Sequence, residues 1–175
     1  AYNNMGNALH HQGSLAFAID SYKQALEIDR GYADAHYNMG NALRDQGNLA
    51  AAIVSYKHAI EIKPSYAEAR NNMGGVLQEQ GNVLAAIDSY KQAIKINPDH
   101  AEAHNNMGYA LTAHGDLAAA IESYKRALDI KPDYADAHCN MGNALAGIIF
   151  LNPNRSWRRL SPAYLPARPS LTPRI

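Results

Sequence analysis

The side chains with the clearest potential for chemistry are asparagines that recur at one fixed spacing. They stand 34 residues apart, each before Met-Gly, at Asn4, Asn38, Asn72, Asn106 and Asn140. A carboxamide can accept a hydrogen bond from a peptide N–H and donate one to a peptide C=O at the same time. A regular row of such groups, which we call the asparagine ladder, would therefore bind the backbone of an extended polypeptide without regard to its sequence.

Two interpretations of the asparagine ladder remain open. If the helices that carry it lie roughly 10 Å apart, an extended chain rising about 3.3 Å per residue would meet one asparagine about every three residues. Alternatively, the amides serve the protein itself, through hydrogen bonds within a helix or between repeats. A second row lies one helical turn further on and favours binding. It consists of Asn7, Asn41 and Asn143, with Gly75 and Tyr109 at its two interrupted positions.

Nucleophilic, acid–base and metal chemistry find little support in the remaining side chains. His100 and His104 have the i, i+4 spacing of some metal-ligand pairs, but no third ligand accompanies them. One repeat position carries histidine three times, at His36, His104 and His138. Cys139 stands where other copies have asparagine or tyrosine, and no nucleophile–base pair, phosphate-binding loop or dinucleotide motif is present. We therefore expect no catalytic residue, no metal site and no cofactor.

An internal repeat with a period of 34 residues positions these side chains. Asn-Met-Gly marks five successive copies without insertion or deletion, and four of the copies are complete. Within each copy, apolar residues fall at helical spacing on two segments that a glycine separates. Each copy is therefore predicted to be a helix-turn-helix hairpin, with helices over about 35–46 and 50–62 in the second copy.

Turn and stop signals recur with the same period. A glycine suited to a left-handed helix end follows the first helix, at Gly13, Gly47, Gly81 and Gly115. The next residue is predicted to cap the second helix, as Ser14, Asn48, Asn82 and Asp116. Proline then ends the second helix at Pro64, Pro98 and Pro132. Within a hairpin, Gly40 and Ala52 let the helices approach, Tyr56 is expected to fill the space toward the next repeat, and neighbouring hairpins must stack.

These positions resemble the tetratricopeptide-repeat signature over residues 1 to about 145. The glycine of the first helix appears as Gly6, Gly40, Gly74 and Gly108, and the alanine–tyrosine–alanine set of the second helix recurs in all four complete copies. The frequent tryptophan of the first helix is replaced by Tyr2, His36, Arg70, His104 and His138. The resemblance implies an all-α fold, a right-handed superhelix (α-solenoid) of antiparallel helix pairs. Residues 1–145 would form this domain, with four full repeats and the first helix of a fifth.

The copies are most similar to the superhelical repeats of protein O-GlcNAc transferases and SPINDLY-type proteins. In this family the first helices line a concave groove, so the resemblance implies that the asparagine ladder binds an extended polypeptide there. The expected function is a protein–protein interaction scaffold. The alternative is the substrate-docking arm of an O-GlcNAc transferase-like glycosyltransferase whose catalytic domain lies outside this chain.

The expected partner is a neutral or basic polypeptide. Residues 1–145 carry sixteen acidic and eleven basic residues, which argues against nucleic acid as a ligand. Chaperone adaptors of this family bind an acidic C-terminal tail with a cationic clamp, but the corresponding positions here hold Asn3 or Tyr37, Glu68 or Glu102, and Asn72 or Asn106. Acidic residues surround the expected groove and would repel such a tail; they are Asp34, Glu68, Glu102 and Asp136.

The last thirty residues differ in composition from the repeats. Residues 146–175 hold five of the eight prolines, five arginines and the only tryptophan, Trp157. Ile149 stands where a turn glycine would be, so we expect the fifth first helix to end at Leu145 and an irregular Pro/Arg-rich tail to follow. A PxxP sequence, Pro166 to Pro169, offers the alternative of a proline-rich ligand.

Composition places the chain among intracellular, cytoplasmic proteins. No segment approaches the roughly 20 consecutive apolar residues of a membrane span, no targeting signal is visible in the sequence, and the single cysteine cannot form an internal disulfide. Interaction with a membrane is not expected. The first and last helices leave apolar end faces uncapped, which suggests self-association as a further possibility.

Overall fold

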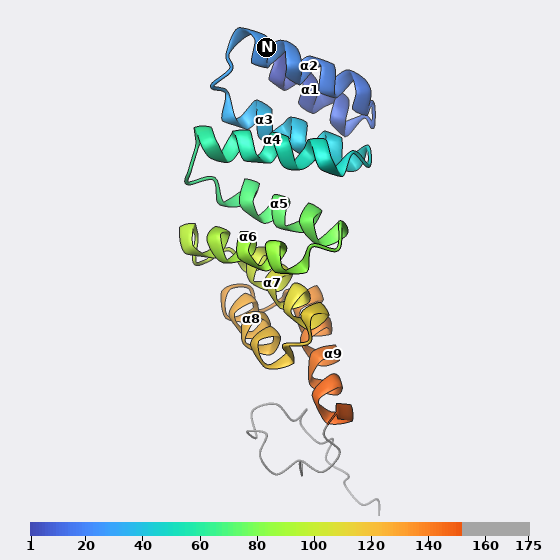
Figure 1. The fold of residues 1–175 in the computed structure, drawn as a ribbon, viewed down its shortest axis with the longest axis vertical. Coiled ribbons are helices and arrows are strands. Elements are labelled where there is room, and N and C mark those ends of the chain that lie inside the picture. Colours follow the sequence, from blue (N-terminus) through green and yellow to red (C-terminus); the bar gives the residue numbers. More distant parts are fainter. Residues whose placement is uncertain (152–175) are drawn as a thin grey trace, which may run out of the picture.

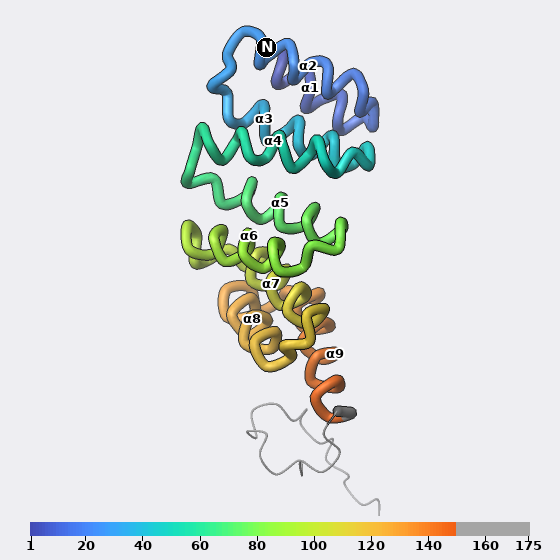
Figure 2. Tube along the Cα trace, viewed as in Figure 1, coloured from blue at the N-terminus to red at the C-terminus, as the bar shows by residue number. Residues whose placement is uncertain are grey.

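The computed structural model describes residues 1–151, and this part of the chain contains nine α-helices and no strand. The first helices of the repeats are α1 (Tyr2–His11), α3 (Ala33–Asp45), α5 (Ala67–Glu79), α7 (Ala101–His114) and α9 (Ala135–Leu151). The second helices are α2 (Leu15–Ile28), α4 (Leu49–Ile62), α6 (Val83–Ile96) and α8 (Leu117–Ile130). Figure 1 shows the hairpins stacked along the long axis of the molecule, and the chain trace in Figure 2 follows the same order. The predicted all-α solenoid is confirmed.

The first helices form the inner side of the stack. Each of them contacts the first helix of the next repeat, as α3 contacts α5 and α5 contacts α7. Among the described helices, second helices of neighbouring repeats do not contact one another. Because the first helices lie closer together, the stack curves around them, and we call the side formed by α1, α3, α5, α7 and α9 the inner face.

The turn between α3 and α4 shows how glycine closes each hairpin. Gly47 has a φ of 84°, its N–H donates to the Arg44 carbonyl at 2.8 Å, and the Asn48 N–H donates to the Leu43 carbonyl at 2.8 Å. This pair of hydrogen bonds is the Schellman pattern of a helix end. The Asn48 side chain then accepts the Ala51 N–H at 3.3 Å and caps α4. The predicted turn glycines are confirmed, since positive φ values recur at Gly13, Gly81 and Gly115.

A tyrosine of the second helix packs against a glycine of the first helix inside each hairpin. Tyr56 is fully buried, and a methyl group added at Gly40 would lie 2.7 Å from its ring. Only glycine therefore lets the two helices close over the ring. The core cluster around Tyr56 also includes Val76 on α5, so the same ring belongs to a core that continues into the next repeat.

Helix α9 runs through Leu151, past the predicted end at Leu145. Because Ile149 replaces the turn glycine, nothing in the sequence stops the helix, and Ile148 packs against the core cluster that α6, α7 and α8 share. The predicted boundary at residue 145 is thus too early. The predicted irregular tail beyond α9, with its PxxP sequence, lies outside the described residues.

No helix within residues 1–151 combines the length and the apolar character needed to cross a lipid bilayer.

Candidate functional site

The asparagine ladder links neighbouring repeats along the inner face. Three of its members donate from Nδ2 to the Oδ1 of an asparagine in the preceding repeat, at 3.1 to 3.2 Å: Asn38 to Asn3, Asn106 to Asn71, and Asn140 to Asn105. These hydrogen bonds support the interpretation in which the amides serve the protein itself. A primary amide has two hydrogens and an oxygen with two lone pairs, so each of these three groups also keeps capacity for a ligand.

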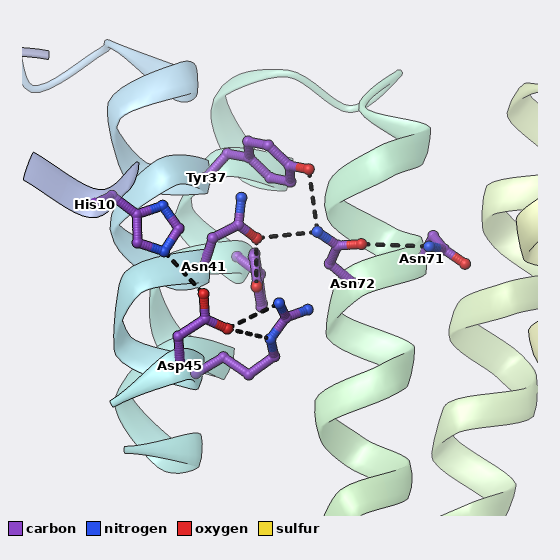
Figure 3. Close-up of polar contacts among 8 residues, drawn as sticks. His10, Tyr37, Asn41, Asp45, Asn71 and Asn72 are labelled. Atoms are coloured by element: carbon purple, nitrogen blue, oxygen red, sulfur yellow. Dashed lines mark hydrogen bonds and ion pairs between the residues drawn. The ribbon is translucent and has the colours of Figure 1, made fainter. Parts of the chain in front are cut away.

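Asn72 differs from the other members because its hydrogens are both in use. Its Nδ2 donates to the Tyr37 hydroxyl and to Asn41 Oδ1, each at 3.0 Å, and its Oδ1 accepts from Asn71 Nδ2 at 3.3 Å (Figure 3). Asn72 therefore acts as a bridge between α3 and α5. In the described part of the chain, Asn4 makes no side-chain hydrogen bond and is exposed on α1.

The second row also has a structural task. Asn7 and Asn41 accept hydrogen bonds from the buried hydroxyls of Tyr22 and Tyr56, at 2.9 and 2.8 Å. An unpaired hydroxyl inside the core would cost roughly 1–3 kcal/mol, so these asparagines stabilise the hairpins. Asn143 on α9 is exposed.

Where the second row is interrupted, other residues take over this task. Tyr90 donates to Gln78 Oε1 at 3.3 Å, and the Tyr124 hydroxyl lies 3.2 Å from Thr112 Oγ1. The interruption at Gly75 and Tyr109 therefore does not leave a buried hydroxyl unpaired. Asparagine is not needed at these two positions for that purpose.

Sequence reasoning missed the residues that hold the ladder in place. They occupy the position just before each ladder asparagine and include three that are almost fully buried: Asn3 and Asn71 at 7% exposed and Asn105 at 6%. Tyr37 occupies the same position in the second repeat. The signal was available, because asparagine recurs there with the repeat period, but its role depends on contacts between repeats.

The charges on the inner face are mostly acidic. Asp34, Glu68, Glu102 and Asp136 lie exposed in the first turns of their helices, where a carboxylate is favoured by the helix dipole. Asp34 also accepts a hydrogen bond from the Tyr66 hydroxyl at 2.9 Å. The four carboxylates expected around the groove are therefore exposed, and their effect on a ligand stays a prediction.

The basic groups at the other end of the inner face are paired. Arg44 donates to Asp45 at 2.9 Å, and His10 Nε2 lies 2.8 Å from the other Asp45 oxygen (Figure 3). Partial burial opposes ionisation of Asp45, but the hydrogen bonds from Arg44 and His10 outweigh it and lower the pKa of this carboxyl. His10 and Asp45 thereby join α1 to α3.

The position of the family's tryptophan carries hydrogen-bond donors that hold the loop between repeats. His104 and His138 donate from Nε2 to the carbonyls of Pro98 and Pro132, at 3.0 and 2.8 Å. Arg70 donates to the Pro64 carbonyl in the same way, at 3.3 Å. Within residues 1–151, no three histidine, cysteine or acidic side chains lie close enough together to hold a metal ion.

A hollow of about 570 Å³ lies between α2, α3 and α4. Its lining includes the apolar Ile19 and Leu43 and the polar Gln46 and Ser55. Two charged residues of the lining, Asp20 and Lys23, pair with each other at 3.5 Å.

Comparison with known proteins identifies the fold. The family model for the TPR repeat matches residues 6–44, 40–81, 79–115 and 108–148. No curated protein matches the chain significantly. A crystal structure of MamA is 29% identical with a TM-score of 0.76, covering 82% of this chain and 84% of that chain.

Two further solved structures share the fold and belong to proteins described with a peptide-binding site or a bound peptide. YrrB, "a TPR protein with an unusual peptide-binding site", is 24% identical with a TM-score of 0.70 and covers 88% of this chain and 86% of its own. The first TPR of Spaghetti (RPAP3), bound to the HSP90 peptide SRMEEVD, is 21% identical with a TM-score of 0.65 and covers 66% and 92%. Since the repeat model matches most of the sequence, the chain belongs to the tetratricopeptide-repeat family.

Proposed function

We propose that this chain is a protein–protein interaction scaffold that binds an extended polypeptide along its inner face. The observation that carries the proposal is the asparagine ladder: amide groups at one repeat position on five successive first helices, most of which keep a hydrogen and an oxygen for a ligand. Peptide binding by YrrB and by the Spaghetti repeat supports this use of the fold. The proposal includes no catalytic step and no cofactor.

The ladder members contribute unequally to this binding. Asn38, Asn106 and Asn140 each use one amide hydrogen between repeats, so the second can donate to a peptide carbonyl while Oδ1 accepts a peptide N–H. Asn72 uses both amide hydrogens in hydrogen bonds within the protein, so its side chain can only accept a hydrogen bond from a ligand. A bound peptide therefore receives most of its backbone contacts on either side of Asn72.

The charge of the inner face favours a neutral or basic segment. Four carboxylates are exposed there, Asp34, Glu68, Glu102 and Asp136, whereas Arg44 already donates its hydrogen bonds to Asp45. An acidic tail of the kind that chaperone adaptors bind would be repelled, because like charges opposed across an interface are unfavourable.

The test must separate binding by the ladder from its role between repeats. The chain offers a matched pair of triple variants. One is Asn38→Ala with Asn106→Ala and Asn140→Ala, and the other is Asn3→Ala with Asn71→Ala and Asn105→Ala. Both remove the same three hydrogen bonds, each worth about 1 kcal/mol, but only the first removes ladder amides. The second also removes the hydrogen bonds from Asn3 to Tyr32 and from Asn71 to Asn72, so both variants are compared at matched thermal stability. Peptides selected on the wild-type protein from a phage-displayed library provide the ligand.

We expect the ladder variant to lose affinity for these peptides by tenfold or more, as judged by fluorescence polarisation, since two or three hydrogen bonds of about 1 kcal/mol are lost. The partner-residue variant should bind within about threefold of wild type. Equal losses in the two variants at equal thermal stability would mean that the ladder acts only between repeats.

Two finer hypotheses rest on this function. The docking arm of an O-GlcNAc transferase-like enzyme would use the same ladder, and a glycosyltransferase domain in the same gene would favour it. Self-association would use the apolar face of the first hairpin, where Met5 is 54% and Phe17 69% exposed. Light scattering over a range of concentrations would show a rising mass if that face pairs with a second copy.

A further inference from the structure

The interruption of the second row at Gly75 leaves one ladder amide without a partner that its counterpart has. Asn72 donates to Asn41 Oδ1 at 3.0 Å, across the boundary between the second and third repeats. One repeat later, Asn106 takes the place of Asn72 and Gly75 takes the place of Asn41. Asn106 donates to Asn71 at 3.1 Å, but glycine has no side chain to accept its second hydrogen.

Space for a ligand exists at this point of the inner face. A methyl group at Gly75 would meet only the Tyr90 hydroxyl, at 3.9 Å, which is an ordinary van der Waals contact. The Tyr90 hydroxyl donates to Gln78, so its oxygen can still accept a hydrogen bond. Tyr109 occupies the equivalent position on α7 and is 55% exposed. The gap therefore has a polar floor, and the neighbouring first helix α7 carries the exposed ring of Tyr109.

The charge next to the gap is negative. Glu79 lies one helical turn after Gly75 on the same face of α5 and is exposed. Burial, and after it the charge of Glu79, raises the pKa of Tyr90, which places this carboxylate near the floor of the gap. Arg44 on α3 is a positive charge that interacts with Glu79. Arg44 already forms an ion pair with Asp45.

From these contacts we infer that Gly75, Asn106, Tyr109 and Glu79 form a subsite for one arginine residue of the bound polypeptide. The inference rests on the proposed function and deepens it. The ligand's backbone carbonyl accepts the second hydrogen of Asn106, in the place that Asn41 fills for Asn72. The arginine side chain lies on the ring of Tyr109 and pairs with Glu79. Arginine suits the site better than lysine, because its flat guanidinium stacks on aromatic rings and binds carboxylates through two hydrogen bonds.

The experiment begins with peptides selected on the wild-type protein from a phage-displayed random library. We expect arginine to be enriched at one position of the selected peptides. Replacing that arginine by alanine in a labelled peptide should weaken binding on the order of tenfold, the combined effect of a cation–π contact and a charged hydrogen bond.

The variant Gly75→Asn then tests the location of the subsite. It places at the gap the carboxamide that Asn41 supplies one repeat earlier, and this side chain takes the space of the ligand's backbone carbonyl. Asparagine is a better helix former than glycine, so the variant should fold and be at least as thermally stable. We expect the tenfold preference for arginine to fall to about onefold, while the arginine-free peptide binds at most about fivefold more weakly, because it loses only the hydrogen bond from Asn106. Glu79→Gln should reduce the preference in part.

Gly142→Asn is the matched control, since a side chain there meets nothing within 4 Å. It should leave the arginine preference unchanged. If peptides are selected but show no arginine enrichment, or if Gly75→Asn keeps the preference, the subsite is wrong and the scaffold function stands. If the wild-type protein selects no peptide at all, the proposed function fails and the subsite with it.

Discussion

The contact between a glycine and a tyrosine ring sets the distance between the two helices of each hairpin. A methyl group at Gly74 would lie 2.7 to 3.0 Å from three ring atoms of Tyr90. Tyr90 is only 1% exposed, so the ring cannot swing into solvent. The helices must separate instead, and separation weakens the core over the whole hairpin.

We therefore predict that Gly74→Ala lowers the free energy of unfolding by roughly 1–3 kcal/mol. Gly142→Ala is the control at the same repeat position, where an added methyl group meets nothing within 4 Å. There the better helix propensity of alanine should raise stability by about 1 kcal/mol. Denaturant unfolding followed by circular dichroism measures both. If Gly74→Ala and Gly142→Ala change the free energy of unfolding by the same amount and in the same direction, the packing argument is wrong.

At the same scale, the sequence identified the ladder asparagines but not the direction of their hydrogen bonds. Period and residue type were enough to place the five amides on one face. Their partners belong to the neighbouring repeat and stand one position earlier, as Asn3 does for Asn38. That pairing depends on how far adjacent hairpins are rotated, which no local pattern encodes. The binding role of the ladder and of the second row stays a prediction.

The helices themselves were predictable because each carries its own start and stop. Turn glycines, capping residues and prolines recur with the period, and α3 and α4 lie within about two residues of the predicted ranges. The prediction for α9, an end at Leu145, is wrong because position 149 lacks the turn glycine. A helix without a stop signal continues while its apolar side can still be buried.

The extension of α9 makes a prediction at this scale. Ile148→Ala removes an apolar side chain that packs on the core cluster shared with α8, and should lower stability by about 1–2 kcal/mol. Hydrogen exchange should become faster for the amides of residues 146–151 than for those of α7. Asn143→Ala, at an exposed position of the same helix, is the control and should leave exchange unchanged. Unchanged exchange in Ile148→Ala would show that the extension does not depend on this contact.

For the whole molecule, the buried tyrosines predict a loss of stability in alkali. Burial raises the pKa of Tyr56, of Tyr90 and, together with a hydrogen bond to Asp34, of Tyr66, each above the usual 10.0. The folded state thus holds these protons more tightly than the unfolded state. Their contribution is fully present below about pH 10 and decreases as the pH rises above it, because the unfolded chain then releases protons that the folded chain retains.

Denaturant midpoints measured on both sides of pH 10 test this prediction. Tyrosinate absorbance, recorded in parallel, should rise for the three buried tyrosines together with unfolding. A single titration near pH 10 with an unchanged denaturant midpoint would show that the tyrosines ionise inside the folded protein.

The hydrogen bonds that the asparagine ladder makes between repeats all point the same way along residues 1–151. In each of these pairs the later repeat donates and the earlier one accepts, from Asn38 to Asn3 through to Asn140 to Asn105. Cys139 takes the accepting position in the fifth repeat, and a thiol is a weak acceptor. The inner face therefore has a direction along the solenoid, because its two ends differ in how donors and acceptors are arranged. A polypeptide lying along it meets a different arrangement of donors and acceptors in each of its two orientations, so the two orientations differ in free energy and one of them is preferred.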